Sequence, residues 1–283
     1  MAGDLTNKQF CAKLLKNVDL VIHCAALSSP WGKYEIFYQS NVEATRNLLT
    51  IAQNENAQKF IFIATPSIYF NYRERWNVKE SDPLPDPIIN HYASTKLEAE
   101  GMVLELNRPD FQTIALRPRA IIGAEDTVIM PRVLRAYHEG KLRIIGDGKN
   151  RVDLTAVVNV IEAIYRCIDA PIEAMGQSYN ITNGEPVLLW EEINEMLSGL
   201  NLPPVTKKLP YWLANFVANA SEKLAFLKGG KEPALTTYGI GILALNFTMD
   251  ISKAREQLNF EPKLTTREAV NEFVNWYKAQ GNA

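Results

Sequence analysis

The chain has 283 residues, of which 47% are hydrophobic and 22% are charged, and its formal net charge is −2. This size and composition are typical of a folded protein with one sizeable core and room for a smaller second domain. The nearly balanced charge forms no basic stripe, which argues against a nucleic-acid partner and favours small molecules.

The cysteines and the first residues of the chain indicate the cellular compartment of the protein. Cys11, Cys24 and Cys167 are odd in number and widely spaced, so we expect three buried free thiols, no disulfide framework and no metal site. The residues after Met1 are polar and do not resemble a signal peptide. We therefore expect a cytoplasmic protein without a transmembrane segment. Homodimer formation stays open.

Strands and helices alternate along the first part of the chain. The run "VDLVIHCAA" (Val18–Ala26) is nearly continuously apolar, as in a parallel strand covered on both faces. A helical pattern over residues 34–52 and a strand over residues 59–64 follow, which together make a βαβ unit. After a polar, proline-rich loop over 71–90 come a helix over 92–106, a strand over 112–118 and a helix over 130–137. This order predicts an α/β fold with a doubly wound parallel sheet.

The pattern of predicted elements changes after Gly146, where the short strands "RVDLTA" and "QSYNIT" alternate with helices over 158–168 and 189–197. We expect residues 1–150 to form a partial dinucleotide-binding domain and residues 151–283 to form mainly a smaller α+β substrate domain, with interleaved segments. The aromatic, amphipathic segment 209–227 is predicted to be a lid on an apolar pocket or a packed helix, with contact to a membrane surface as the alternative.

Candidate chemistry lies where the predicted strands end, because open α/β sheets bind ligands there. "ATPS" (Ala64–Ser67) ends one strand, and "HYASTK" (His91–Lys96) opens the next helix. Tyr92 and Lys96 are four residues apart and so share a helix face. A lysine ammonium beside a phenol lowers the tyrosine pKa from about 10. Such a tyrosine can exchange protons with an alcohol or carbonyl, with a Thr65 or Ser67 hydroxyl holding the same oxygen.

Two similar patterns elsewhere are weaker. Tyr137 and Lys141 repeat the four-residue spacing, but Gly140 is expected to end the helix before the lysine, so Tyr137 is predicted to be structural. The stretch "YGIGILA" (Tyr238–Ala244) has glycine spacing but lies late in the chain. It is predicted to be a turn in the substrate domain and no dinucleotide loop.

Several stretches occur in an order that spans essentially the whole chain, namely "GDLTN", "VDLVIHCAA", "NVEATRNLL", "KFIFIATPSIYF", "HYASTKLEAE", "ALRPRAIIGA" and "VDLTAVVNVIEAI". Together they resemble the extended short-chain dehydrogenase/reductase superfamily, of the NAD-dependent epimerase/dehydratase type. Within it, the chain looks most like the 3β-hydroxysteroid dehydrogenase-like group, which includes 2-alkyl-3-oxoalkanoate reductases. The resemblance implies a Rossmann-like fold, NAD or NADP as cofactor, and a role in lipid or steroid metabolism through alcohol–ketone interconversion on a hydrophobic steroid-like or long-chain β-keto substrate.

The resemblance also implies roles for individual residues. Tyr92 matches the general acid/base, Lys96 the group that binds the nicotinamide ribose and tunes the tyrosine, and Thr65 the hydroxyl on the reacting oxygen. The matching cofactor-binding residues are Asp4, Leu5, Ala25, Ala26, Asn41, Tyr92, Lys96 and Pro118. Ser67 and His91 are candidates to face the substrate, with a surface or capping role as the alternative for His91. On the residues alone, Asp4 is equally a helix N-cap and Asn41 a satisfied core amide.

One family feature is absent, the Gly-x-x-Gly-x-x-Gly turn that binds the cofactor pyrophosphate. We therefore expect a phosphate-binding unit of about 30 residues or more before Met1. Without it, "VDLVIHCAA" would be an exposed apolar edge. The choice between NAD and NADP stays open. Two alternative functions also remain: a nucleotide-sugar epimerase or dehydratase, and a truncated remnant without cofactor that acts as a binding protein.

Overall fold

A central parallel sheet organises the fold. The computed structural model describes residues 1–227, 233 and 235–281. Within these residues the sheet has four strands in the order β1-β2-β4-β9, and every neighbouring pair runs parallel. The strands are β1 (Leu20–His23), β2 (Lys59–Ile63), β4 (Gln112–Pro118) and β9 (Ser178–Ile181). Helical connections join consecutive strands, as parallel pairing requires.

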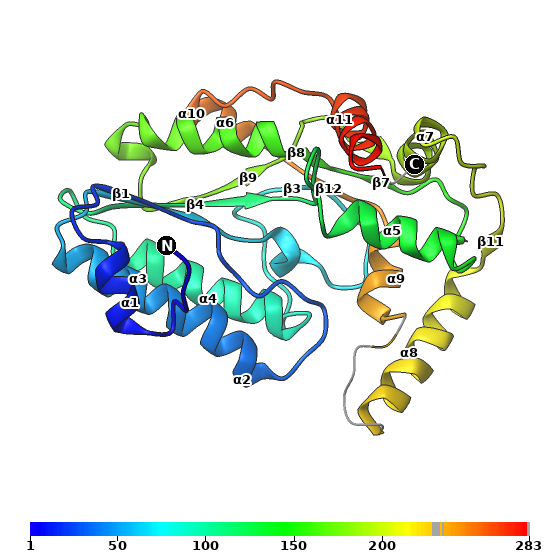
Figure 1. Cartoon of the computed structure of the whole chain (residues 1–283), viewed down its shortest axis with the longest axis horizontal. Helices are drawn as coiled ribbons and strands as arrows, with labels where there is room; N and C mark the ends of the chain where they lie inside the picture. The colour runs from blue at the N-terminus through cyan, green and yellow to red at the C-terminus, as the bar shows by residue number, and fades with distance from the viewer. Residues whose placement is uncertain (228–232, 234, 282–283) are drawn as a thin grey trace.

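Helices cover both faces of this sheet (Figure 1). One face carries α1 (Lys8–Leu14), α3 (Ala44–Asn54) and α4 (His91–Glu105), and the other carries α6 (Val157–Ile168) and α10 (Ser252–Leu258). Successive side chains of a strand point to opposite faces. Accordingly, Phe60 and Phe62 pack with the first group of helices, and Ile61 packs with the second. The predicted α/β fold with a doubly wound parallel sheet is confirmed.

Strand β1 lies at the edge of the sheet and has one exposed face. Val21 and His23 are buried, whereas Ile22 is 42% exposed. The expectation of a strand covered on both faces is therefore wrong for β1. The alternative expectation, that this strand forms an exposed apolar edge of the sheet, agrees with the described residues. Cys24, directly after β1, is exposed, which corrects the expectation of three buried thiols. Cys11 and Cys167 are buried, and all three thiols are free.

The helix expected over residues 34–52 forms as three consecutive segments, α2 (Tyr34–Phe37), the π-helix η1 (Tyr38–Glu43) and α3. Two other segments differ from expectation. The predicted loop over 71–90 contains β3 (Arg75–Val78), which has no apolar alternation because Val78 is its one buried residue. The predicted turn over 238–244 is the helix α9 (Thr237–Ala244).

The glycines that suggested a turn at α9 have other roles. The side chain of Thr236 caps this helix by accepting a hydrogen bond from the Gly239 amide at 3.0 Å. A Cβ atom at Gly241 would lie 2.8 Å from the Phe70 ring, so a larger residue there would force this ring or the helix to shift. A capping threonine therefore starts a helix that the glycine spacing had obscured.

A second sheet joins distant parts of the chain. Its order in the described residues is β10-β7-β12-β3, and β12 runs parallel to both β7 and β3. Its other strands are β7 (Arg151–Val152), β10 (Val187–Leu188) and β12 (Phe247–Met249). Short parallel ladders pair β5 (Ile121–Ile122) with β8 (Thr155–Ala156), and β6 (Ile144–Ile145) with β11 (Lys208–Leu209). Segments from both sides of residue 150 thus build each of the two larger sheets.

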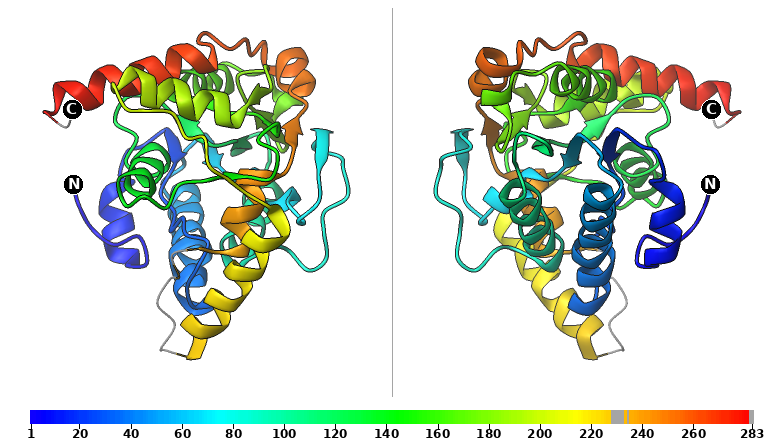
Figure 2. Two further views of the ribbon diagram at one scale, coloured as in Figure 1. Left: turned by 90° about the vertical axis from the view of Figure 1, so that its right-hand side faces the viewer. Right: turned by 90° about the vertical axis from the view of Figure 1, so that its left-hand side faces the viewer.

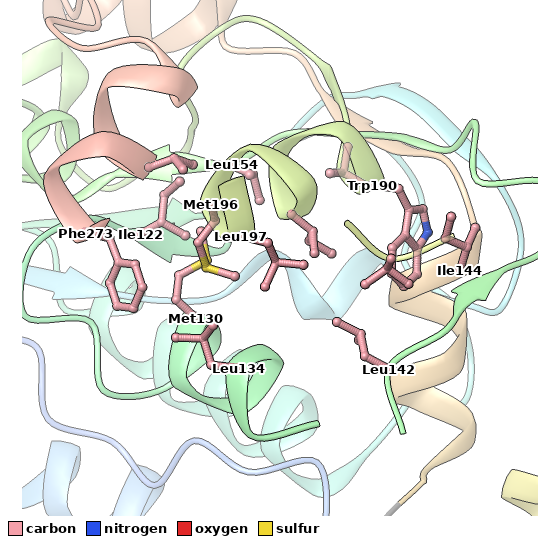
Figure 3. Close-up of a cluster of buried hydrophobic side chains, with 14 of the residues drawn as sticks. Ile122, Met130, Leu134, Leu142, Ile144, Leu154, Trp190, Met196, Leu197 and Phe273 are labelled. Atoms are coloured by element: carbon pink, nitrogen blue, oxygen red, sulfur yellow. The ribbon is translucent and has the colours of Figure 1, made fainter. Parts of the chain in front are cut away.

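A second hydrophobic core lies beside this sheet. Its helices are α5 (Ile129–His138), α7 (Leu189–Gly199) and α11 (Thr266–Ala279). Figure 3 shows Met130 and Leu134 of α5 facing Met196 and Leu197 of α7, with Phe273 of α11 nearby. Thr265 and Glu268 start α11 with a reciprocal capping box.

Helix α8 (Tyr211–Leu227) projects from the body of the molecule (Figure 2). Ala214 and Ala218 on its inner side are buried, whereas Trp212 and Phe216 are 71% and 68% exposed. These aromatic side chains therefore lie on the outer face of the helix, where they line an open surface hollow with other α8 residues, away from the sheet edge. In the part of the chain that is described, no helix is long and apolar enough to cross a membrane.

The two short 3-10 helices are η2 (Pro66–Tyr69) and η3 (Ile172–Ala174).

Candidate active site

The carboxyl edge of the parallel sheet gathers most of the residues predicted for the site. Ala25 and Ala26 lie in the exposed loop after β1, Thr65 follows β2, and Pro118 ends β4. Helix α4 begins at the same edge, where the Asn90 side chain accepts a hydrogen bond from the Ala93 amide at 2.8 Å. This cap fixes the first turn of the helix.

Tyr92 and Lys96 lie one turn apart on α4, as their spacing predicts. Tyr92 is partly buried, and Lys96 is 2% exposed. The Lys96 ammonium donates to the Ile63 carbonyl at 2.5 Å and lies 3.9 Å from the centroid of the Phe62 ring. Burial lowers the pKa of Lys96 to about 7, against the opposing charge of Glu100. In the described structure this ammonium therefore faces the end of β2 and forms no hydrogen bond with the Tyr92 phenol.

Three hydroxyl groups form a chain beside α4. Thr65 caps η2 by accepting from the Ser67 amide at 3.2 Å, and its hydroxyl donates to Ser67 Oγ at 3.1 Å. Ser67 Oγ in turn lies 2.9 Å from the hydroxyl of Tyr238 on α9. Burial raises the pKa of the Tyr238 phenol, while the charge of Arg119 lowers it. Sequence reasoning missed Tyr238 because it lies 171 positions from Ser67.

Asn41 ties the loop after β1 to the helix that carries Tyr92. Its side-chain carbonyl accepts from the Leu27 amide at 2.8 Å, and its amide group donates to Thr95 Oγ1 at 3.1 Å. Asn41 sits in the π-helix η1, and such turns frequently occur at functional sites. These hydrogen bonds support the backbone around the site. They agree both with a buried amide that is satisfied within the core and with the asparagine of the family. Direct contact between Asn41 and the cofactor stays a prediction.

Beneath the site, a buried ion pair joins α4 to β4. The Arg117 guanidinium donates to both carboxylate oxygens of Glu100, with the Nε to Oε2 bond at 3.0 Å. It also donates to the Tyr69 hydroxyl, which donates to Asn180 Oδ1 of β9 at 3.2 Å. Burial opposes the charge on Arg117, but the hydrogen bonds and charge of Glu100 raise its pKa. This network fixes α4 against the sheet one turn beyond Lys96.

A second buried arginine, Arg119, follows Pro118 and was not identified from the sequence. Its side chain is buried, with the guanidinium carbon 4.4 Å from the centroid of the Phe247 ring. Its Nε has no hydrogen-bond partner in the described structure. Nearby Asp153 accepts from the Met249 amide through Oδ2 at 2.7 Å, whereas its Oδ1 has no described partner. Burial lowers the pKa of Arg119 and raises that of Asp153 to about 6.

Three predicted residues form no hydrogen bond with this cluster in the described structure. Asp4 is exposed and accepts from the Thr6 amide at 2.9 Å. The N-cap of α1 is Asn7, so the alternative interpretation of Asp4 as a helix cap is wrong. The Leu5 carbonyl accepts from the Asn47 side chain at 3.1 Å, on the α1 and α3 side of the sheet. His91 is exposed, with its ring edge-on to that of Tyr34 at 5.5 Å between centroids.

The helix of the second Tyr-x-x-x-Lys stretch ends before its lysine, as predicted. Helix α5 ends at His138, and Gly140 adopts a left-handed backbone with φ of +65°. The Tyr137 hydroxyl donates to the Pro203 carbonyl at 2.9 Å, and Lys141 pairs with Glu139 at 2.7 Å. The two side chains therefore bond to different partners.

The fold is that of a doubly wound α/β protein, and proteins of this class bind ligands beyond the carboxyl ends of their strands. The chain belongs to the NAD dependent epimerase/dehydratase family, an extended short-chain dehydrogenase/reductase family, whose sequence profile matches residues 1–182. The members of this family are NAD(P)-dependent oxidoreductases and epimerases.

Individual relatives agree with this assignment. The chain is similar to 3beta-hydroxysteroid-dehydrogenase/decarboxylase isoform 1 of Arabidopsis thaliana, with 32% identity covering 97% of this chain and 66% of that protein. It is similar to the 2-alkyl-3-oxoalkanoate reductase of Shewanella oneidensis, with 29% identity covering 95% of this chain and 72% of that protein. It shares its fold with UDP-glucuronic acid 4-epimerase from Bacillus cereus in complex with NAD, at a TM-score of 0.75 and 22% identity over 99% of this chain and 80% of the other.

The residues at the sheet edge fit the nicotinamide end of such a cofactor. A lysine ammonium has three N–H donors, and the one hydrogen bond of Lys96 to a described residue goes to the Ile63 carbonyl. Its remaining donors can hold ribose hydroxyls beside Tyr92. Residues 1–283 hold no Gly-x-x-Gly-x-x-Gly turn, the motif that binds the pyrophosphate in this family.

Proposed function

We propose that the protein is an NAD(P)-dependent oxidoreductase that interconverts a secondary alcohol and a ketone on a hydrophobic substrate. The observation that carries this proposal is the placement of Tyr92 and Lys96 on one face of α4, at the carboxyl edge of the sheet and beside the loop that holds Thr65. Family membership supports the cofactor class. The names of two relatives support a steroid-like or long-chain 3-oxo substrate.

Each side chain has a defined task in this proposal. Tyr92 takes the proton of the substrate hydroxyl during oxidation and returns it to the carbonyl oxygen during reduction. Lys96 holds ribose hydroxyls beside Tyr92 with its remaining N–H donors. Thr65 donates a hydrogen bond to the reacting oxygen, and Asn41 keeps the neighbouring loop in place. The chemistry supplied by a bound nicotinamide is hydride transfer at the carbinol carbon.

The surroundings of the hydroxyl chain favour an apolar substrate. The Phe70 ring lies edge-on to those of Tyr72, Tyr238 and Phe247, with centroids 5.7, 5.6 and 6.0 Å away. Ile68, Phe70 and Phe247 belong to one buried cluster that Tyr238 partly covers. An aromatic wall of this kind excludes water from a site of hydride transfer. The similarity to a nucleotide-sugar epimerase is one of fold, so we rank that function second.

The chain offers a matched pair of variants as a test. Tyr92→Phe removes the proposed proton carrier, and Tyr137→Phe removes the same atom from the other Tyr-x-x-x-Lys stretch. With methyl 3-hydroxydecanoate and NAD⁺ or NADP⁺, we expect Tyr92→Phe to lower kcat about 10²–10⁴-fold. Tyr137→Phe should match the wild type, and NADH binding measured by fluorescence should persist in both.

Equal activity of Tyr92→Phe and wild type would contradict the assigned role of Tyr92. Turnover of UDP-glucose with none of the hydroxy ester would favour the epimerase. If the full-length protein binds neither NADH nor NADPH, the oxidoreductase proposal fails and a binding protein without cofactor is favoured.

A further inference from the structure

Arg119 is a buried cation whose hydrogen-bonding capacity is unused. A guanidinium has five N–H donors and no acceptor, and buried charges in proteins are normally paired. Among the described residues, the contact assigned to the Arg119 side chain is the π face of Phe247. Its Nε is shielded from solvent and has no hydrogen-bond partner. Such a group in a native fold indicates a missing partner.

The neighbouring acid does not satisfy Arg119. Asp153 is 1% exposed, and its charge acts on Arg119, but no hydrogen bond joins the two side chains in the described structure. Asp153 Oδ2 is occupied by the Met249 amide, and Oδ1 has no partner. A cation with free donors and an acid with a free oxygen therefore lie in one buried region. Two unsatisfied groups of complementary chemistry are typical of a polar ligand site.

This region adjoins the proposed reaction centre. Arg119 directly follows Pro118 at the end of β4, the same sheet edge at which Thr65 and Tyr92 lie. Tyr238 connects the two, because its hydroxyl bonds to Ser67 while the charges of Arg119 and Tyr92 both act on its phenol. A ligand with two polar groups can therefore place one at Thr65 and Tyr92 and the other at Arg119.

We propose that Arg119 binds the carboxylate of the substrate, so that the natural substrate is a hydrophobic 3-hydroxy or 3-oxo acid. This inference rests on the proposed alcohol–ketone function and narrows it. A planar guanidinium pairs with a carboxylate through two parallel hydrogen bonds. In a 3-oxo acid one carbon separates the carboxyl carbon from the ketone carbon, so one molecule carries both polar groups. Asp153, when protonated, can donate to the same carboxylate.

The names of the relatives agree with this proposal. One is a 2-alkyl-3-oxoalkanoate reductase, and the other is a hydroxysteroid dehydrogenase/decarboxylase. Both names describe substrates with a carboxyl group.

The test compares an acid with its ester. We would measure kcat/KM for 3-hydroxydecanoate and for methyl 3-hydroxydecanoate in the wild type, Arg119→Met, Arg119→Lys and Arg73→Met. Arg73 is exposed and controls for the loss of one positive charge. We expect the acid-to-ester ratio to fall about 10- to 100-fold in Arg119→Met, mainly through KM, because a charge-assisted pair is lost. Arg119→Lys should fall between, and Arg73→Met should keep the wild-type ratio.

A binding measurement separates this inference from the proposed function. Decanoate carries the carboxylate but no reacting alcohol, and its binding is measured by calorimetry on the full-length protein. Loss of decanoate binding in Arg119→Met, with retention in Arg73→Met, supports the carboxylate site even if neither alcohol is oxidised. Equal binding of decanoate by wild type and Arg119→Met overturns the inference, as does an equal effect of Arg119→Met on acid and ester.

Discussion

Arg117 and Arg119 are two positions apart at the end of β4, and both are buried, yet their surroundings differ in kind. Arg117 donates to Glu100 and Tyr69, and these contacts raise its pKa. Arg119 has an aromatic face beneath it and an unpartnered Nε, and burial lowers its pKa. The first arginine completes a network within the fold, whereas the second keeps its donors for something outside it.

The contrast distinguishes two uses of a buried charge. A charge whose hydrogen bonds are all made by the protein contributes to structure, and removing either partner leaves the other uncompensated. A charge left unpaired is a cost to the fold that a ligand can offset. Stability measurements on the two arginines should therefore give different results.

The largest effect is expected from Arg117→Met. It leaves the Glu100 carboxylate buried without its partner, so the free energy of unfolding should fall by about 3–5 kcal/mol. Urea denaturation followed by circular dichroism measures this change. The double variant Arg117→Met with Glu100→Leu removes both charges and should recover much of the loss. No recovery would mean that the pair acts through packing and not through charge.

Asp153→Asn should change the pH dependence of stability. Burial raises the pKa of Asp153 from 3.8 to about 6. Between these values the folded state holds a proton that the unfolded state has released, so wild-type stability falls as pH rises from 4 to 6. The shift corresponds to about 3 kcal/mol. Asp153→Asn keeps an acceptor for the Met249 amide and should lack this component. Identical slopes in the two proteins between pH 4 and 6 would contradict the raised pKa.

Tyr238→Phe tests the link between the two regions. It removes the hydrogen bond to Ser67, which is 2.9 Å long, and leaves the Thr65 contact to Ser67 intact. We expect a loss of about 1 kcal/mol in the free energy of unfolding. A loss as large as that of Arg117→Met would show that Tyr238 belongs to the structural network.

The smallest stability effect is expected from Arg119→Met. The variant loses a cation–π contact but also the desolvation cost of an unpaired charge, so we expect the free energy of unfolding to stay within about 1 kcal/mol of the wild type. Chemical denaturation at pH 7 without ligand measures this. A loss of 3 kcal/mol or more would show that Arg119 stabilises the fold as Arg117 does, and would contradict the proposed difference between the two arginines.

Much of the fold could be predicted from the sequence because its signals are local. The apolar run of β2 and the helical pattern of α4 each identify an element from adjacent residues. Strand β3 gave no such signal, because its pairing with β12 and not an apolar pattern holds it in place. The edge position of β1 was foreseen, but the exposure of Cys24 was not.

The site residues also fall into two groups, those with a local signal in the sequence and those recognised only by contacts with distant residues. Tyr92 and Lys96 share a four-residue spacing at a predicted helix start, and Thr65 follows a predicted strand, so neighbouring residues identify all three. Arg119, Asp153 and Tyr238 derive their meaning from partners far along the chain, such as Met249 for Asp153 and Ser67 for Tyr238. No pattern in one sequence reveals that a buried arginine lacks a partner. That observation required the three-dimensional structure.

The parallel pairing of β3 with β12 has a consequence for synthesis of the chain. Val78 pairs with Met249, so β3 emerges from the ribosome about 170 residues before its partner. At about 5–20 residues per second, roughly 10–30 s pass before the second sheet can close. During this interval Phe70, which packs on Phe247, lacks its cover. The nascent polypeptide thus exposes an aromatic surface to chaperones until its last quarter has been made.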